Sequence, residues 1–238
     1  LEVAAGSDPL DSLMPLYNRA LDLSEPAAYA QVAQGPKLQN SITLEAWIKL
    51  VSADDNTGTI IEKSDDAGDI DFKLWLNQGK LALDYRDSDG QLQQLELADV
   101  ALSQASGWAH VAVSMDAIFN TARLSVYDTA TGTETEDVVY SISRFKGREG
   151  PLTVGATDPL EALACYVDEV RVWRINRTPS QIRDARHFPI DGSTANLDVY
   201  FRFDDQQAAS NPVGAEDFTS RLNNLADWQT HAEWALTL

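Results

Sequence analysis

Acidic side chains are the residues of this sequence whose spacing could support chemistry. Two carboxylates on one face of a strand could act as nucleophile and general acid on a glycosidic bond, and residues i and i+2 of a strand share a face. Three runs come near this pattern, at 134–137, 68–71 and 168–169. Glu134 and Glu136 would share a face, but their Thr- and Gly-rich surroundings predict a loop.

The other two acidic runs fit catalysis no better. Asp69 and Asp71 share a face, but Phe72 follows instead of another acid. Asp168 and Glu169 are adjacent, so we expect them on opposite faces of a strand. The three histidines lack metal-ligand spacing, and no phosphate loop or nucleophile elbow is present. We therefore predict a protein that is not an enzyme.

Acidic loops offer a second kind of chemistry, the binding of a hard cation or a polar ligand. Five acids flank a predicted strand near residues 59–63, namely Asp54, Asp55, Asp65, Asp66 and Asp69. We expect them to gather in adjacent connections at the rim of the fold, where carboxylates suit Ca²⁺ and loops carry function. The alternative is that they are solvated surface residues. The run 87–90 lacks the downstream Glu of a calcium loop and predicts a hairpin turn.

The charge balance excludes several partners. The chain of 238 residues has 37 acidic and 18 basic residues, for a formal charge of −19. Such a surface repels nucleic acid and anionic lipid, and no apolar run is long enough to span a membrane.

The first residues lack the pattern of a signal peptide, so the chain reads as a mature start or a piece of a longer protein. Its one cysteine, Cys165, predicts a core position and excludes an internal disulfide.

Short alternating strands must position these residues. The clearest is 41–50, where Ile42, Leu44, Ala46 and Ile48 are expected to face the core and Thr43, Glu45, Trp47 and Lys49 to face outward. About ten such runs between turns indicate an all-β sandwich or barrel. One helix is expected near 179–186, with Thr178 as its cap, Pro179 first and Gln181 third.

The ends of the chain differ from its middle. We predict an N-terminal extension at 1–15, one sandwich domain at 16–190, and a C-terminal segment at 191–238 that is appended to the sandwich or leads to another domain. Within the segment, 197–203 predicts a strand.

The order of the motifs resembles the LamG-like jelly-roll domains of the concanavalin A-like lectin/glucanase superfamily, with similarity also to pentraxins. The pieces that carry the resemblance are ALDL at 20–23, YAQV at 29–32, ITLEAWIK at 42–49, IIEK at 60–63, GWAHVAV at 107–113, LTVG at 152–155 and YVDEVRVW at 166–173. Each piece alone is unspecific, but their common order and spacing identify the fold. Leu23 and Cys165 depart from the family, which usually has Gly there.

The resemblance implies an all-β, two-sheet antiparallel jelly-roll with one short helix. It also implies a structural Ca²⁺ held by Asp22 and Asp168, where the first strand meets the last core strand. The alternative is that Asp22 caps a turn and Asp168 pairs with an arginine such as Arg171. Residues 200–205 are similar to a segment that flanks such modules in large multidomain proteins, so other domains of a parent chain are expected partners.

Sugar binding would use an aromatic platform with amides and carboxylates beside it. Trp47, Trp108 and Trp173 belong to core motifs, so Trp75 is the best exposed candidate. We predict a non-catalytic binding or adhesion module of an extracellular or cell-surface protein, of bacterial type because it lacks disulfides. Its ligand would be a glycan or an extracellular protein. The alternatives are a structural or protein-interaction spacer and a divergent glycosidase or polysaccharide lyase.

Overall fold

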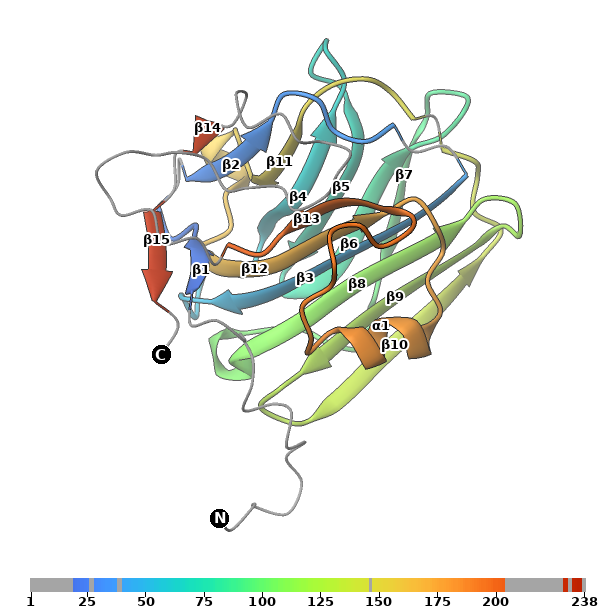
Figure 1. Ribbon diagram of the computed structural model, residues 1–238. Coiled ribbons are helices and arrows are strands. Elements are labelled where there is room, and N and C mark those ends of the chain that lie inside the picture. Colours follow the sequence, from blue (N-terminus) through green and yellow to red (C-terminus); the bar gives the residue numbers. More distant parts are fainter. Residues whose placement is uncertain are drawn as a thin grey trace.

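Two antiparallel sheets pack face to face and form a sandwich (Figure 1). The computed structural model describes residues 19–25, 28–37, 40–145, 147–203, 229–230 and 233–236. We call the two layers sheet A and sheet B. The predicted all-β jelly-roll with one short helix is confirmed.

Sheet A is the larger layer. In spatial order it contains β10 (Thr133–Tyr140), β9 (Thr121–Asp128), β8 (Trp108–Asp116), β3 (Ser41–Leu50), β12 (Cys165–Trp173), β1 (Arg19–Asp22) and β15 (Glu233–Leu236), while β13 (Leu197–Phe201) also pairs with β12. Sheet B has the order β14 (Gln229–Thr230), β2 (Tyr29–Val32), β11 (Leu152–Gly155), β4 (Gly58–Ser64), β5 (Ile70–Asn77), β6 (Lys80–Arg86) and β7 (Leu92–Glu96).

Strand alternation builds the core between the sheets. Ile42, Leu44, Ala46 and Ile48 of β3 join it as predicted, and the intervening Trp47 packs on the outer face of sheet A. Burial of these side chains is the main favourable contribution to the fold.

Two local predictions were wrong. Glu134 and Glu136 lie in the edge strand β10 and not in a loop. Asp168 and Glu169 do not point to opposite faces, because β12 bulges between Asp168 and Arg171 and Glu169 has a φ of 50°. The bulge turns the Glu169 carboxylate to the outer face, where it pairs with Arg171.

The single predicted helix is α1 (Pro179–Ala185), which lies across the outer face of sheet A (Figure 1). The Thr178 hydroxyl accepts a hydrogen bond from the Gln181 amide, and Gln181 reaches back to the Thr178 amide, as a capping box requires. No helix in the described part of the chain is long and apolar enough to span a membrane.

The predicted strand at 197–203 is β13, shortened to 197–201. Three strands from the segment 191–238 pair within the two sheets: β13 with β12, β14 with β2 and β15 with β1. The boundaries at 15 and 190 stay a prediction, and the extension 1–15 lies outside the described residues.

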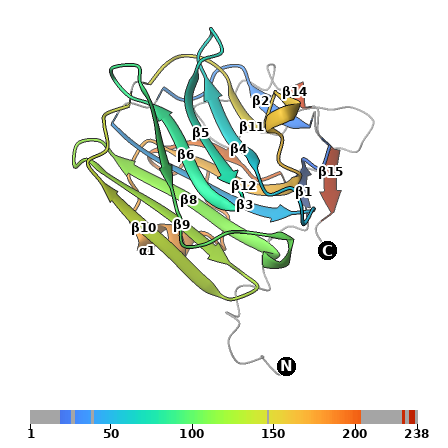
Figure 2. The same ribbon diagram turned by 180° about the vertical axis from the view of Figure 1, so that it is seen from behind.

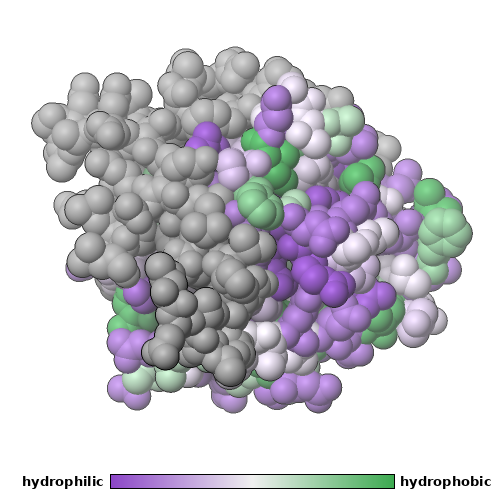
Figure 3. Space-filling view, turned by 60° about the horizontal axis from the view of Figure 1, so that its bottom comes forward, coloured by the Kyte–Doolittle hydropathy of each residue, from purple (hydrophilic) through white to green (hydrophobic). Residues whose placement is uncertain are grey.

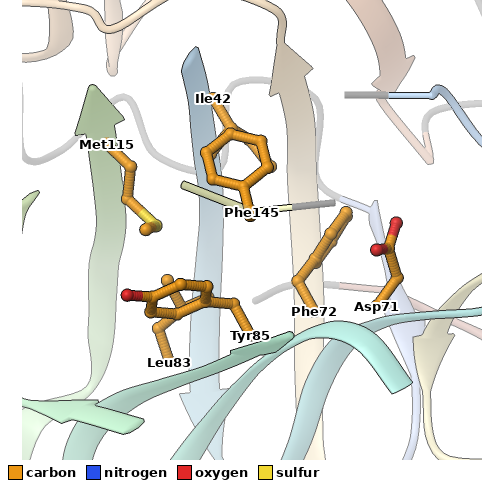
Figure 4. Close-up of a pocket in the computed structure, with 7 residues that line it drawn as sticks. All are labelled: Ile42, Asp71, Phe72, Leu83, Tyr85, Met115 and Phe145. Atoms are coloured by element: carbon orange, nitrogen blue, oxygen red, sulfur yellow. The ribbon is translucent and has the colours of Figure 1, made fainter. Parts of the chain in front are cut away.

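A small cavity remains between the sheets near one end of the sandwich (Figure 4). Its lining is apolar except for the Asp71 carboxylate at its edge, and the space holds no more than about one water molecule. Phe72 and Tyr85 of sheet B and Phe145 of a crossing loop turn their rings into it. This space is a packing defect and not a ligand site.

Gly79, in the turn between β5 and β6, should tolerate substitution poorly. Its φ is +80°, and a Cβ would lie 2.3 Å from the Leu102 carbonyl oxygen. Gly90 has nearly the same φ, +82°, but no atom lies within 4 Å of its Cβ position. We expect Gly90→Ala to cost about 1 kcal/mol from backbone strain alone and Gly79→Ala at least about 2 kcal/mol more. Urea unfolding of both variants measures the difference, and equal losses would contradict the close approach.

Candidate functional site

A row of polar side chains crosses the outer face of sheet B from β2 to β7. Strand register places its members side by side: Gln31, Thr153, Glu62, Lys73, Asp84 and Gln94, which we call the polar row. Their strand neighbours, such as Val154, Ile61 and Leu74, face the core, so alternation directs the row outward. No described helix or strand covers the central strands of this face (Figure 2).

Trp75 lies beside the polar row. It sits opposite Thr59 on β4 and Ala82 on β6. Its indole N–H donates a 3.1 Å hydrogen bond to Asp84, whose same oxygen accepts 3.0 Å from the Gln94 amide. The indole is therefore held in one orientation, half-buried, with its N–H turned to the row.

The lysine of the row is held by a carboxylate that lies outside the row. The Lys73 ammonium lies 3.4 Å from both carboxylate oxygens of Glu161 and 5.1 Å from the centre of the Trp75 ring. Burial raises the pKa of Glu62, and the nearby Glu161 charge raises it further against the hydrogen bond from Ser64. Lys73 and Asp84 are only 8% and 7% exposed, so the row is tightly packed and preorganised.

A short 3-10 helix, η3 (Pro159–Glu161), borders the row beside Trp75. Asp158 caps it through the Leu160 amide, and residue Ala162 forms a bridge with Thr59 of β4. This places Glu161 against Lys73 and leaves Leu160 almost wholly exposed at the border. The face thus combines an aromatic ring, an aliphatic side chain and alternating donors and acceptors.

The predicted acidic cluster does not form. Asp54 and Asp55 precede β4, whereas Asp65, Asp66 and Asp69 follow it, so the seven residues of that strand separate the two groups by about 20 Å. Asp55 accepts a hydrogen bond from the Ala164 amide, and Asp54 and Asp66 are exposed. The prediction failed because consecutive connections of a strand lie at opposite ends of it.

Asp65 and Asp69 have a structural role instead. Both pair with Arg148, and Asp65 also accepts the amides of Ala67 and Asp69. These contacts pull the pKa of Asp65 below its usual value against the effect of burial. Asp71, which was expected to share a face with Asp69, is buried and pairs with Lys63. The group therefore anchors the loop that contains Arg148 over one end of the sandwich.

The two predicted calcium ligands lie on one face of sheet A. In the register of β1 and β12, Asp22 lies opposite Tyr166. Asp168 follows Tyr166 by two residues on β12 and so shares its face of the sheet. Asp22 accepts the Ser24 amide, as a turn cap does, and the buried Asp168 accepts the Glu169 amide. The side chain of Arg171 pairs with the carboxylate of Glu169. Among the described residues no group of three or more acids, histidines or cysteines is arranged to hold a metal ion.

Sequence reasoning singled out Trp75 but missed the polar row. Each member sits in an alternating strand, and alternation alone shows that it faces outward. The alignment across strands depends on register, including the bulge between Thr59 and Ile61. Lys73 next to Trp75 was the one local signal, since i and i+2 residues share a face.

Known proteins share the fold of this chain. The sequence model of the concanavalin A-like lectin/glucanases superfamily matches residues 24–183, and a search of curated proteins found no match. Among solved structures, a Bacteroides ovatus ATCC 8483 protein that is proposed to bind carbohydrate has a TM-score of 0.65 at 18% identity, covering 92% of this chain and 60% of that one. The present chain therefore spans 60% of the length of that protein.

Two further solved structures have a similar fold. The SAP-like pentraxin of Limulus polyphemus has a TM-score of 0.50 at 11% identity, covering 90% of this chain and 96% of its own. The LG1-3 region of the laminin alpha2 chain has a TM-score of 0.51 at 12% identity, covering 68% and 32%. At these identities the likeness concerns the fold alone. The match of the family model over about two thirds of the chain shows that this chain belongs to the concanavalin A-like lectin/glucanases superfamily.

Proposed function

We propose that this chain is a non-catalytic glycan-binding module, and that it binds through the outer face of sheet B. The observation that carries the proposal is the position of Trp75 beside the polar row. An indole offers an apolar face to the C–H groups of a sugar ring, while amides, hydroxyls and carboxylates in fixed positions match its hydroxyls. The Bacteroides ovatus protein of similar fold is proposed to bind carbohydrate, which supports the same role here.

The chemistry of the row favours a neutral, extended sugar chain. Two acids flank a lysine in the middle of the row and amides lie at its two ends, so donors and acceptors are mixed along the sheet. An extended chain would run along the row and contact several members at once. We propose that the module belongs to a larger secreted or cell-surface bacterial protein.

A glycan array tests the proposal directly. Binding of neutral oligosaccharides by the whole chain is the expected result. Silence across diverse glycans, with and without Ca²⁺, would favour a spacer or protein-interaction role. Turnover of a bound polysaccharide that is lost in Glu62→Gln would instead favour a glycosidase, since a carboxyl of raised pKa is suited to act as a general acid.

Trp75→Ala should weaken glycan binding at least about tenfold, because tryptophan anchors dominate binding energy at such surfaces. The matched control is Phe119→Ala, since Phe119 is 76% exposed in the turn between β8 and β9 of sheet A. Isothermal titration with the best glycan from the array gives both affinities. An equal loss in the two variants, or no loss in Trp75→Ala, would contradict the assigned face.

Structural calcium at Asp22 and Asp168 stays a prediction drawn from the family. It requires further oxygen ligands beyond these two carboxylates. Thermal melting in CaCl₂ and in EDTA measures it, with a higher Tm in calcium expected because a ligand that binds only the native state stabilises it. Equal Tm values, or a calcium effect that persists in Asp22→Asn, would contradict a site at these residues.

A further inference from the structure

A groove of about 270 Å³ lies on the outer face of sheet A, where α1 leaves the sheet uncovered. Its floor is formed by β8, β9 and β10, with Ser114, Arg123 and Val138 aligned across them. Its wall is the segment 176–179, which joins β12 to α1. The described surface around α1 and β10 is largely hydrophilic (Figure 3).

The wall of the groove is fixed by buried hydrogen bonds. Ser114, 2% exposed, donates to the Asn176 side-chain oxygen and lies 2.9 Å from the Arg177 carbonyl. The Thr43 hydroxyl donates to the Ile175 carbonyl and accepts from the Arg177 amide. The groove therefore has a set shape before any ligand arrives.

These bonds leave the groove rich in donors. Because its oxygen accepts from Ser114, the exposed Asn176 keeps its amide N–H groups for a ligand. Arg123 is 29% exposed and pairs through one nitrogen with Glu136, at 2.8 Å, so its other N–H groups stay available. No acid belongs to the lining, although the chain carries 37 of them.

The same groove has an apolar side. Tyr140, 71% exposed, stands opposite Thr121 at the end of β10, and Val138 and Pro179 line the space near it. A donor-rich site with an aromatic wall suits a ligand that has both an anionic acceptor and a ring with C–H groups.

We propose that this groove binds a carboxylate-bearing sugar, with Arg123 and Asn176 donating to the carboxylate and Tyr140 packing on the ring. It is a second site, remote from the neutral-glycan face that the proposed function assigns to sheet B.

NMR titrations with methyl glucuronide and methyl galacturonide test the groove, with methyl glucoside and sodium acetate as comparison ligands. At least one uronide should bind at millimolar concentration, while the glucoside and acetate bind at least tenfold more weakly. Failure of both uronides to bind, or equal binding by acetate, would overturn the proposal.

Substitutions separate binding from folding. Arg123→Gln should weaken uronide binding roughly tenfold or more, as expected for loss of a charge-assisted hydrogen bond. Glu136→Gln breaks the same ion pair but frees Arg123, so binding should be retained or tightened. Arg183→Gln, an exposed arginine of α1 outside the lining, should change nothing.

Tyr140→Ala should weaken binding, and Tyr140→Phe should restore it. Equal weakening in Arg123→Gln and Glu136→Gln would show a structural role for the pair and contradict the site. Trp75→Ala should leave uronide binding intact, so failure of the sheet B site and failure of the groove are distinguishable.

Discussion

Glu45→Gln is expected to lower the free energy of unfolding by about 3–5 kcal/mol, because it leaves buried arginines without their carboxylate. Glu45 is fully buried on the outer face of sheet A, beneath the segment that leads into α1. Its Oε1 accepts a 2.5 Å bond from Arg177, and its Oε2 lies 3.5 Å from His110 and 4.0 Å from Arg171.

The network around Glu45 extends to β13. Arg171, 1% exposed, pairs at 2.5 Å with Glu169, which also accepts 2.6 Å from the Tyr200 hydroxyl. Arg171 further donates to the Ala185 and Phe188 carbonyls. If one charge is removed from such a group, the remaining charges stay buried without a partner of opposite sign. This explains the size of the expected loss.

Urea unfolding measures the effect, and Glu136→Gln is its control. Glu136 also pairs with an arginine, Arg123, but the two side chains are 43% and 29% exposed. Exposed pairs contribute about 0–1 kcal/mol because solvent screens them. A Glu45→Gln loss as small as that of Glu136→Gln would contradict a tightly coupled buried network.

Acidification should destabilise the protein below pH 6.5, and His110 should account for about 3 kcal/mol of the loss. Burial lowers the pKa of His110 to about 4, only partly offset by the Glu45 carboxylate. The unfolded chain therefore binds a proton near pH 6.5, whereas the folded chain binds it only near pH 4. The contribution of His110 to stability is therefore complete above pH 6.5 and is lost as the pH falls from 6.5 to 4, below which both states bind the proton.

Protonation of Glu45 should cause a further loss of stability at lower pH. Burial alone would raise the pKa of Glu45, but the hydrogen bond with His110 and the charges of Arg171 and Arg177 outweigh it and hold the pKa at about 2. The unfolded carboxyl takes its proton near pH 4.5, so stability falls between pH 4.5 and 2.

Urea unfolding at pH 7, 5.5 and 4.5 tests this window. Between pH 6.5 and 4, the free energy of unfolding should change more steeply with pH in the wild type than in His110→Gln. The difference in slope should be up to about 1.4 kcal/mol per pH unit. The groups that face His110 are Glu45, Arg171 and Arg186, and all three remain in the variant. Identical pH profiles would show that His110 is protonated in the native state near pH 6.

The elements of this fold follow from local pattern, whereas the site depends on register. Alternation in β3 and the capping box of α1 involve neighbours in sequence, so they were predictable. The pairing of Asp65 with Arg148 joins residues 83 positions apart, and the polar row needs the register of five strand pairs. Strand alternation predicted the wrong face for Glu169 because a bulge rotates the backbone there. Trp75 was found because alternation separated it from the core tryptophans.

The most direct test of glycan binding on sheet B is chemical-shift mapping with the best glycan from the array. The largest changes should fall on the Trp75 indole N–H and on the amides of Glu62, Lys73 and Asp84, which share one face of the sheet. Changes confined to sheet A or to the rim loops at 53–57 and 65–69 would contradict the assignment of this face.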